Sequence, residues 1–112
     1  KAVISFTSGG INIYLGGGES PHIGTVVISQ PRPSLRESGV TSCTTSVFNL
    51  LGHKDDEIAI PMAEKICKNT NRVVVVTAGI HIDHATTEDI DRLKMASSEL
   101  TQKILQLWQE GK

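Results

Sequence analysis

Residues 72–82 read RVVVVTAGIHI and carry the strongest fold signal in the chain. Four consecutive valines are typical of a central strand covered on both faces, because β-branched side chains suit a pleated surface and no position is left polar. Alternation along the strand places His81 on the same side as Gly79. The sequence therefore predicts the best-buried strand of a sheet, with glycine and histidine at its carboxyl end.

Four further strand-like runs precede this segment, at residues 2–7, 11–15, 23–29 and 41–50. Ser8, Gly9 and Gly10 separate the first two runs, and this turn signal predicts a hairpin. Pro31 and Pro33 are expected to end the third run, because proline has no N–H to donate to a strand ladder.

A change of period marks a helix over residues 57–69, where apolar residues recur at four-residue spacing. Pro61 leaves the start of this helix open. Either Asp55 or Asp56 caps a first turn that is bent at the proline, or the regular helix begins near Pro61 as a first-turn residue.

The longest helix is predicted from Thr86 to about Gln109, with Thr86 as the cap and Asp89 completing a variant of the capping box. The element order is thus ββββαβα. It predicts an α+β fold with a mostly antiparallel sheet of about five or six strands and two helices. If both helices lie against one face, the other face needs cover, which favours a homodimer.

Composition sets limits on the class of protein. The 112 residues suit a single domain over 1–112, and the net charge of −1 without a basic run argues against nucleic-acid binding. No segment reaches the roughly 18 to 20 apolar residues of a membrane span, so a cytoplasmic protein that binds no membrane is expected. Cys43 and Cys67 are expected to be ordinary core thiols.

All four histidines lie in three glycine-containing segments, at residues 16–24, 51–56 and 76–84, which we expect to converge on one site. In the first segment a glycine-rich loop is expected, whose backbone N–H groups form a nest for a phosphate or carboxylate. A plain hairpin loop is the alternative. The candidate ligand-binding residues here are Gly17, Gly18, His22 and Gly24.

The second segment places His53 and Lys54 at the amino end of a helix, where the dipole and free N–H groups attract anions. Asp55 and Asp56 are expected to be structural caps of that helix. Arg32, held between two prolines, is a candidate for a bidentate contact with the same anion.

The third segment contributes Gly79 and His81 as candidates. Zinc, iron or nickel binding by His81, Asp83 and another histidine is an alternative, although the spacing matches no known metal motif. A small histidine-based enzyme acting on a small acid is another, but no nucleophile motif is present. Holding an anion is the first hypothesis and catalysis the second.

These motifs, in their order and spacing, resemble the small prenylated flavin chaperone family, typified by the small accessory component of gallate decarboxylase. The resemblance rests on Pro21-His22-Ile23-Gly24, Gly52-His53-Lys54-Asp55 and Thr77-Ala78-Gly79-Ile80-His81. It spans most of the chain. Residues 31–46 depart from the family pattern in being longer.

The resemblance implies a fold similar to proteasome assembly chaperones and a non-catalytic accessory of a UbiD-like decarboxylase. Such a protein binds or delivers prenylated flavin mononucleotide (prenylated FMN), or FMN itself. The residues that would contact the flavin phosphate or ring are His22, Gly24, His53, Lys54, Gly79 and His81. An assembly chaperone that captures a partner protein without a small ligand is the remaining alternative.

Overall fold

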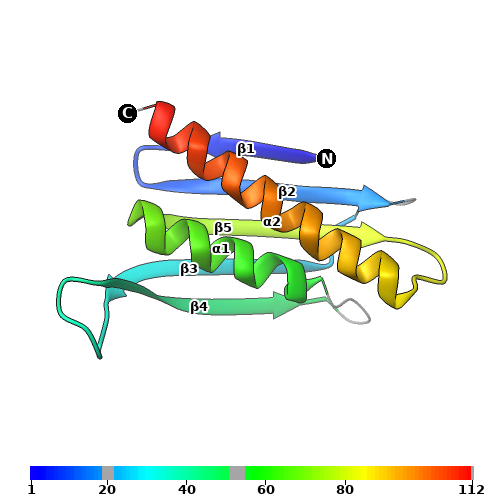
Figure 1. Ribbon diagram of the computed structural model, residues 1–112, viewed down its shortest axis with the longest axis horizontal. Coiled ribbons are helices and arrows are strands. Elements are labelled where there is room, and N and C mark those ends of the chain that lie inside the picture. The colour runs from blue at the N-terminus through cyan, green and yellow to red at the C-terminus, as the bar shows by residue number, and fades with distance from the viewer. Residues whose placement is uncertain (19–21, 51–54, 112) are drawn as a thin grey trace.

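A computed structural model describes residues 1–18, 22–50 and 55–111, and shows one sheet with both helices on the same face (Figure 1). The elements are β1 (Ala2–Phe6), β2 (Gly10–Gly18), β3 (Thr25–Pro33), β4 (Thr41–Asn49), α1 (Asp56–Thr70), β5 (Val73–His81) and α2 (Thr87–Glu110). The predicted order ββββαβα and the α+β class are confirmed.

The five strands lie in the order β1-β2-β5-β3-β4, so β5 is central as predicted. β1 and β2 form the predicted antiparallel hairpin, and β3 is antiparallel to both β4 and β5. The sheet is nevertheless mixed, because β2 and β5 run parallel. α1 returns the chain across the sheet before β5 begins, and this crossover allows a parallel pair.

The burial of β5 differs between its two faces. Val74, Val76 and Ala78 face the helices and are fully buried. Val73 and Val75, on the other face, are only partly buried. The sequence predicted that β5 is covered on both faces. Among the described residues, only the face toward the helices is fully covered.

β2 extends further than predicted. Residues from Gly16 onward were expected to form a loop, but Gly16, Gly17 and Gly18 stay in the strand, with Gly18 opposite His81 on β5. The reason is that backbone partners are available on both sides, since the Gly16 N–H also donates to the Lys1 carbonyl at 2.9 Å. All three glycines thus belong to a ladder and not to an open nest.

The prediction that the prolines end β3 is also wrong. The ladder between β3 and β5 does stop at Ser29, but pairing with β4 continues to Pro33, which lies opposite Thr41. N–H groups of a strand point alternately to its two edges. Pro31 and Pro33 therefore place both missing donors on one edge, and the other edge remains able to pair.

α1 is the better packed of the two helices. It begins at Asp56 with Pro61 inside it, so the alternative in which the regular helix starts near Pro61 is wrong. One face of α1 lies in the core against β3, β4 and β5, and its side chains Met62 and Ile66 are 1% and 0% exposed.

α2 runs diagonally over the sheet and packs beside α1 (Figure 1). Its predicted capping box is confirmed: the Asp89 N–H donates to Oγ1 of Thr86 at 3.1 Å, and the Thr86 N–H donates to Oδ2 of Asp89 at 3.0 Å. Of its residues, only Thr101 and Ile104 are buried. Neither described helix is both long and apolar enough to cross a membrane.

Candidate functional site

Residues from the first and third predicted segments meet at one end of the sheet, where β2 and β5 finish and β3 begins. Gly18 lies opposite His81, and the Gly24 N–H donates to the Ala78 carbonyl at 2.8 Å. We call the group Gly18, His22, Gly79, His81 and Asp55 the histidine corner. His53 and Lys54 lie outside the described residues, and their neighbour Asp55 is the nearest described residue of the second segment.

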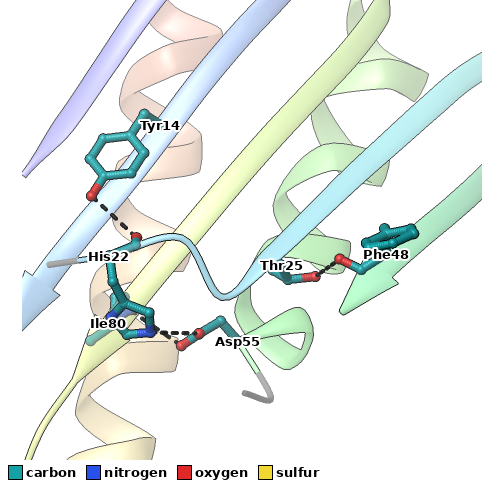
Figure 2. Close-up of polar contacts among 6 residues, drawn as sticks. All are labelled: Tyr14, His22, Thr25, Phe48, Asp55 and Ile80. Atoms are coloured by element: carbon teal, nitrogen blue, oxygen red, sulfur yellow. Dashed lines mark hydrogen bonds and ion pairs between the residues drawn. The ribbon is translucent and has the colours of Figure 1, made fainter. Parts of the chain in front are cut away.

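The segment that carries His22 reaches this corner by passing close to β5. The Tyr14 hydroxyl donates to the His22 carbonyl at 3.3 Å (Figure 2). The His22 N–H donates to the Gly79 carbonyl at 3.4 Å. A Cβ at Gly79 would overlap the His22 carbonyl. Gly79 is therefore needed for the chain itself to pass, and this role was not part of the sequence prediction.

Gly18 has a conformational role at the same place. Its φ is +73°, and a Cβ there would overlap the carbonyl oxygen of His81. Since side chains strongly disfavour this region of φ, glycine is required where β2 leaves the sheet. The two strands can then end together beside the histidines.

Asp55 ties the start of α1 to the end of β5. Its Oδ1 accepts a hydrogen bond from the Ile80 N–H at 3.3 Å, and its Oδ2 lies 3.9 Å from Nε2 of His22 (Figure 2). Asp55 occupies the N-cap position but makes no capping hydrogen bond with its side chain. The predicted structural role holds, but through β5 and not through a cap. Asp56 likewise accepts from the side-chain amide of Asn49 at 3.1 Å.

His81 is paired with a second aspartate. Its Nε2 lies 2.6 Å from Oδ1 of Asp83, and both side chains are about half exposed. The rings of His22 and His81 meet edge to face, with centroids 6.3 Å apart. The Asp83 carboxylate accepts the Nε2–H of His81, which orients the imidazole and leaves Nδ1 for a further hydrogen bond.

The charges at this corner differ from those of a simple anion site. The first turn of α1 carries Asp56 and Glu57 next to Asp55, and these carboxylates offset the positive end of the helix dipole. Binding of a phosphate at this helix start therefore depends on His53 and Lys54, for which anion binding stays a prediction. The described histidine and aspartate pairs are better suited to hydrogen-bonding a polar, uncharged group.

Arg32 is not brought to the histidine corner. It lies at the far end of β3, opposite Ser42, roughly 23 Å along the strand from Thr25. Its Nε–H donates to Oγ1 of Thr44 at 3.0 Å, and its Nη1–H donates to the Pro33 carbonyl at 3.1 Å. The structure gives Arg32 partners within the β3–β4 hairpin.

Tyr14 contacts the histidine corner through the His22 carbonyl and was not among the candidates chosen from the sequence. Its alternation with Gly16 puts both on the face of β2 away from the helices, and a Cβ at Gly16 would clash with the Tyr14 ring. This pairing of a tyrosine with a glycine two residues later is the signal that could have pointed to it. The contact with His22 depends on the crossing chain and is invisible in the sequence.

The metal alternative gains no support from the part of the chain that the structure describes. Within it, no group of three or more histidine, cysteine, aspartate or glutamate side chains is placed to hold a metal ion.

A family model described as the prenylated flavin chaperone LpdD-like domain matches residues 1–109, which include every strand, nearly all of both helices and the histidine corner. None of the curated proteins matches the chain.

Proposed function

The chain belongs to the prenylated flavin chaperone family, and on this premise we propose that it binds prenylated FMN at the histidine corner and delivers it to a UbiD-like decarboxylase. The observation that carries the proposal is the convergence of His22 and His81 at the ends of β2 and β5. Glycines at positions 18 and 79 let the backbones of His81 and His22 approach closely, which brings the two histidines together.

The pairing of each histidine with an aspartate supports contacts with the polar edge of the flavin ring. A flavin carries an N–H donor flanked by two carbonyl acceptors on one edge, and an oriented imidazole can complement either kind of group. Both His22 and His81 retain exposure to solvent, at 23% and 47% of their side chains. The site is therefore open to a ligand, as delivery to a partner enzyme requires. Plain FMN shares the same polar edge and is the second ligand to test.

The binding proposal predicts selective effects of histidine substitutions. We expect His22→Ala and His81→Ala each to weaken the affinity for prenylated FMN by about three- to tenfold, the effect of one lost hydrogen bond. His84→Asn is the matched control, because His84 lies beyond the end of β5 with φ +55°, which asparagine tolerates.

Isothermal titration calorimetry with prenylated FMN and FMN measures these affinities. Absence of binding by the wild-type protein, or equal losses in all three variants, would contradict the proposal. On sequence grounds His53→Ala or Lys54→Ala should also weaken binding more than Cys67→Ala, a substitution in the core of α1.

We also propose that the protein is a homodimer that covers the face of the sheet away from the helices. Large apolar side chains on that face are exposed, with Val3 at 51%, Ile28 at 39% and Phe48 at 70%. Val26 and Phe48 are opposite one another across β3 and β4. Light scattering after size-exclusion chromatography should give twice the chain mass of 12.1 kDa for the wild type, and Phe48→Glu should lower the measured mass toward that of one chain.

One observation favours a second function. The 2.6 Å contact between His81 and Asp83 is the geometry of a general base held by an orienting carboxylate. A histidine-based enzyme would turn over a small acid without a partner. Product formation by the purified protein, abolished in His81→Ala, would favour catalysis over the accessory role.

A further inference from the structure

A pocket of about 320 Å³ lies at the same end of the sheet as the histidine corner, between the sheet and the first half of α2. Its floor and roof are formed by Leu15, Gly17 and Ile80 from the strands and Leu93, Ala96 and Leu100 from α2. Apart from Lys1 and Ser97, every side chain in the lining is apolar or absent. The pocket is thus a hydrocarbon-lined space beside a polar corner.

The space exists because the first half of α2 stands away from the core. None of its residues from Thr87 to Leu100 is buried, whereas Thr101 and Ile104 further along are 3% and 0% exposed. The second half therefore anchors the helix. Leu93 and Leu100 point inward but remain partly exposed, as expected when the volume below them is not filled by protein.

Gly17 shows that a missing side chain helps to keep this space open. Unlike Gly18, it has no positive φ, and a Cβ at Gly17 would make only ordinary contacts with Ile80, at 3.7 Å and 3.8 Å. The backbone therefore does not require glycine at this position. Glycine inside a strand is less favourable than alanine by roughly 0.5–1 kcal/mol. Its effect here is to leave room in the pocket.

The pocket and the histidine corner meet at the strand ends. Ile80 lines the pocket, and its N–H donates to Asp55 of the corner. Gly17 lines the pocket, and the next residue, Gly18, lies opposite His81. Small-molecule sites have volumes of roughly 300–1,000 Å³, so this pocket suits one apolar portion of a ligand whose polar portion lies at the corner.

We propose that this pocket receives the hydrocarbon addition of the prenylated flavin and makes the protein prefer prenylated FMN to FMN. This inference rests on the proposed function for the identity of the whole ligand. The flavin ring would lie at the ends of β2 and β5, with the five-carbon unit beneath α2 and the polar ring edge at the histidines.

The test fills the pocket without touching the corner. Ala96→Phe places a ring in the roof of the pocket, and Gly17→Val fills it from the floor. Gln102→Phe is the control, since it adds the same side chain on an exposed part of α2. Calorimetric titrations with prenylated FMN and with FMN are compared for all four proteins.

We expect the wild type to bind prenylated FMN more tightly than FMN. Ala96→Phe and Gly17→Val should weaken the affinity for prenylated FMN by about tenfold, because the methyl groups of its five-carbon unit are no longer buried. The affinity for FMN should stay unchanged. Gln102→Phe should change neither affinity. Equal weakening of both ligands, or no change in either, overturns the assignment of the pocket.

A flavin-independent measurement separates this inference from the proposed function. The five-carbon alcohol 3-methylbut-2-en-1-ol is added to protein labelled in its methyl groups, and NMR shifts are followed at Ile80, Leu93 and Leu100. Shifts at these methyls that vanish in Ala96→Phe support the pocket even if no flavin binds, which would refute only the flavin proposal. Shifts spread evenly over the protein, or none, overturn the pocket.

Discussion

α1 and α2 cover the same face of the sheet but are held there by very different amounts of apolar contact. α1 buries seven of its 15 residues, and α2 buries two of its 24. The helix with the stronger local signals, α2 with its capping box, is thus the one less fixed by the core. The difference teaches that a helix can be well specified locally and still leave space beneath it for a ligand.

The largest expected effect comes from comparing matched truncations in the two helices. Ile66→Ala removes a fully buried side chain of α1 and should lower the free energy of unfolding by about 3 kcal/mol. Leu93→Ala, over the pocket, should cost less than about 1 kcal/mol because few atoms pack below it. Urea denaturation measures both values. Equal losses would show that α2 is packed as tightly as α1.

A smaller effect is expected at the cap of α2. Thr86→Ala removes the side-chain acceptor of the Asp89 N–H and should destabilise the protein by about 1 kcal/mol. Thr87→Ala, one residue later on an exposed position, serves as the control and should change little. Thermal unfolding by circular dichroism compares them. If the two substitutions cost the same, the capping box does not stabilise α2.

The same cap makes the first turn of α2 sensitive to acid. Hydrogen bonds from the backbone and side chain of Thr86 lower the pKa of Asp89 below its ordinary value of 3.8. A lowered pKa means that the stabilisation is present above that ordinary value and is lost as the pH falls through the folded-state pKa. Amide exchange at the start of α2 should therefore rise below about pH 4 relative to Asp89→Asn. Equal profiles would contradict this.

The smallest effect is expected in an experiment that changes no residue, the chemical labelling of the two thiols. Burial, followed by the charges of Cys43 and Glu64, raises the pKa of the Cys67 thiol on α1 to about 11. Cys43 is partly exposed, so a thiol reagent should label it first, and Cys67 only as the protein unfolds. Mass spectrometry of the labelled protein follows both. Rapid labelling of Cys67 would mean that α1 opens readily.

Periodicity and turn chemistry predicted the element order, the hairpin, the central strand and the cap of α2, because each depends on neighbours in the sequence. The extents of β2 and β3 were missed because strand partners that are distant in sequence decide them: β5 keeps Gly17 in a ladder, and β4 keeps Pro33 in one. The presence of a glycine or proline predicts which backbone conformations are possible at that position, but it does not predict which strand lies beside it.

In the candidate site, too, the sequence predicted residue types but not the positions that depend on the fold. His22 and His81 were singled out by residue type, and the structure brings them together. Arg32 was chosen for its charge, yet its place depends on the direction of β3, which no local pattern reveals. Asp55 was interpreted as a cap because its helix was visible in the sequence and the Ile80 N–H was not.

The prolines of β3 have a consequence for association between molecules. Beyond Ser29 the edge of β3 that faced β5 has no neighbouring strand among the described residues, and an open edge with regular donors is a template for pairing with another chain. Pro31 and Pro33 remove two donors from that edge. The β3–β4 arm can therefore extend past the sheet while resisting the edge-to-edge growth from which aggregates form.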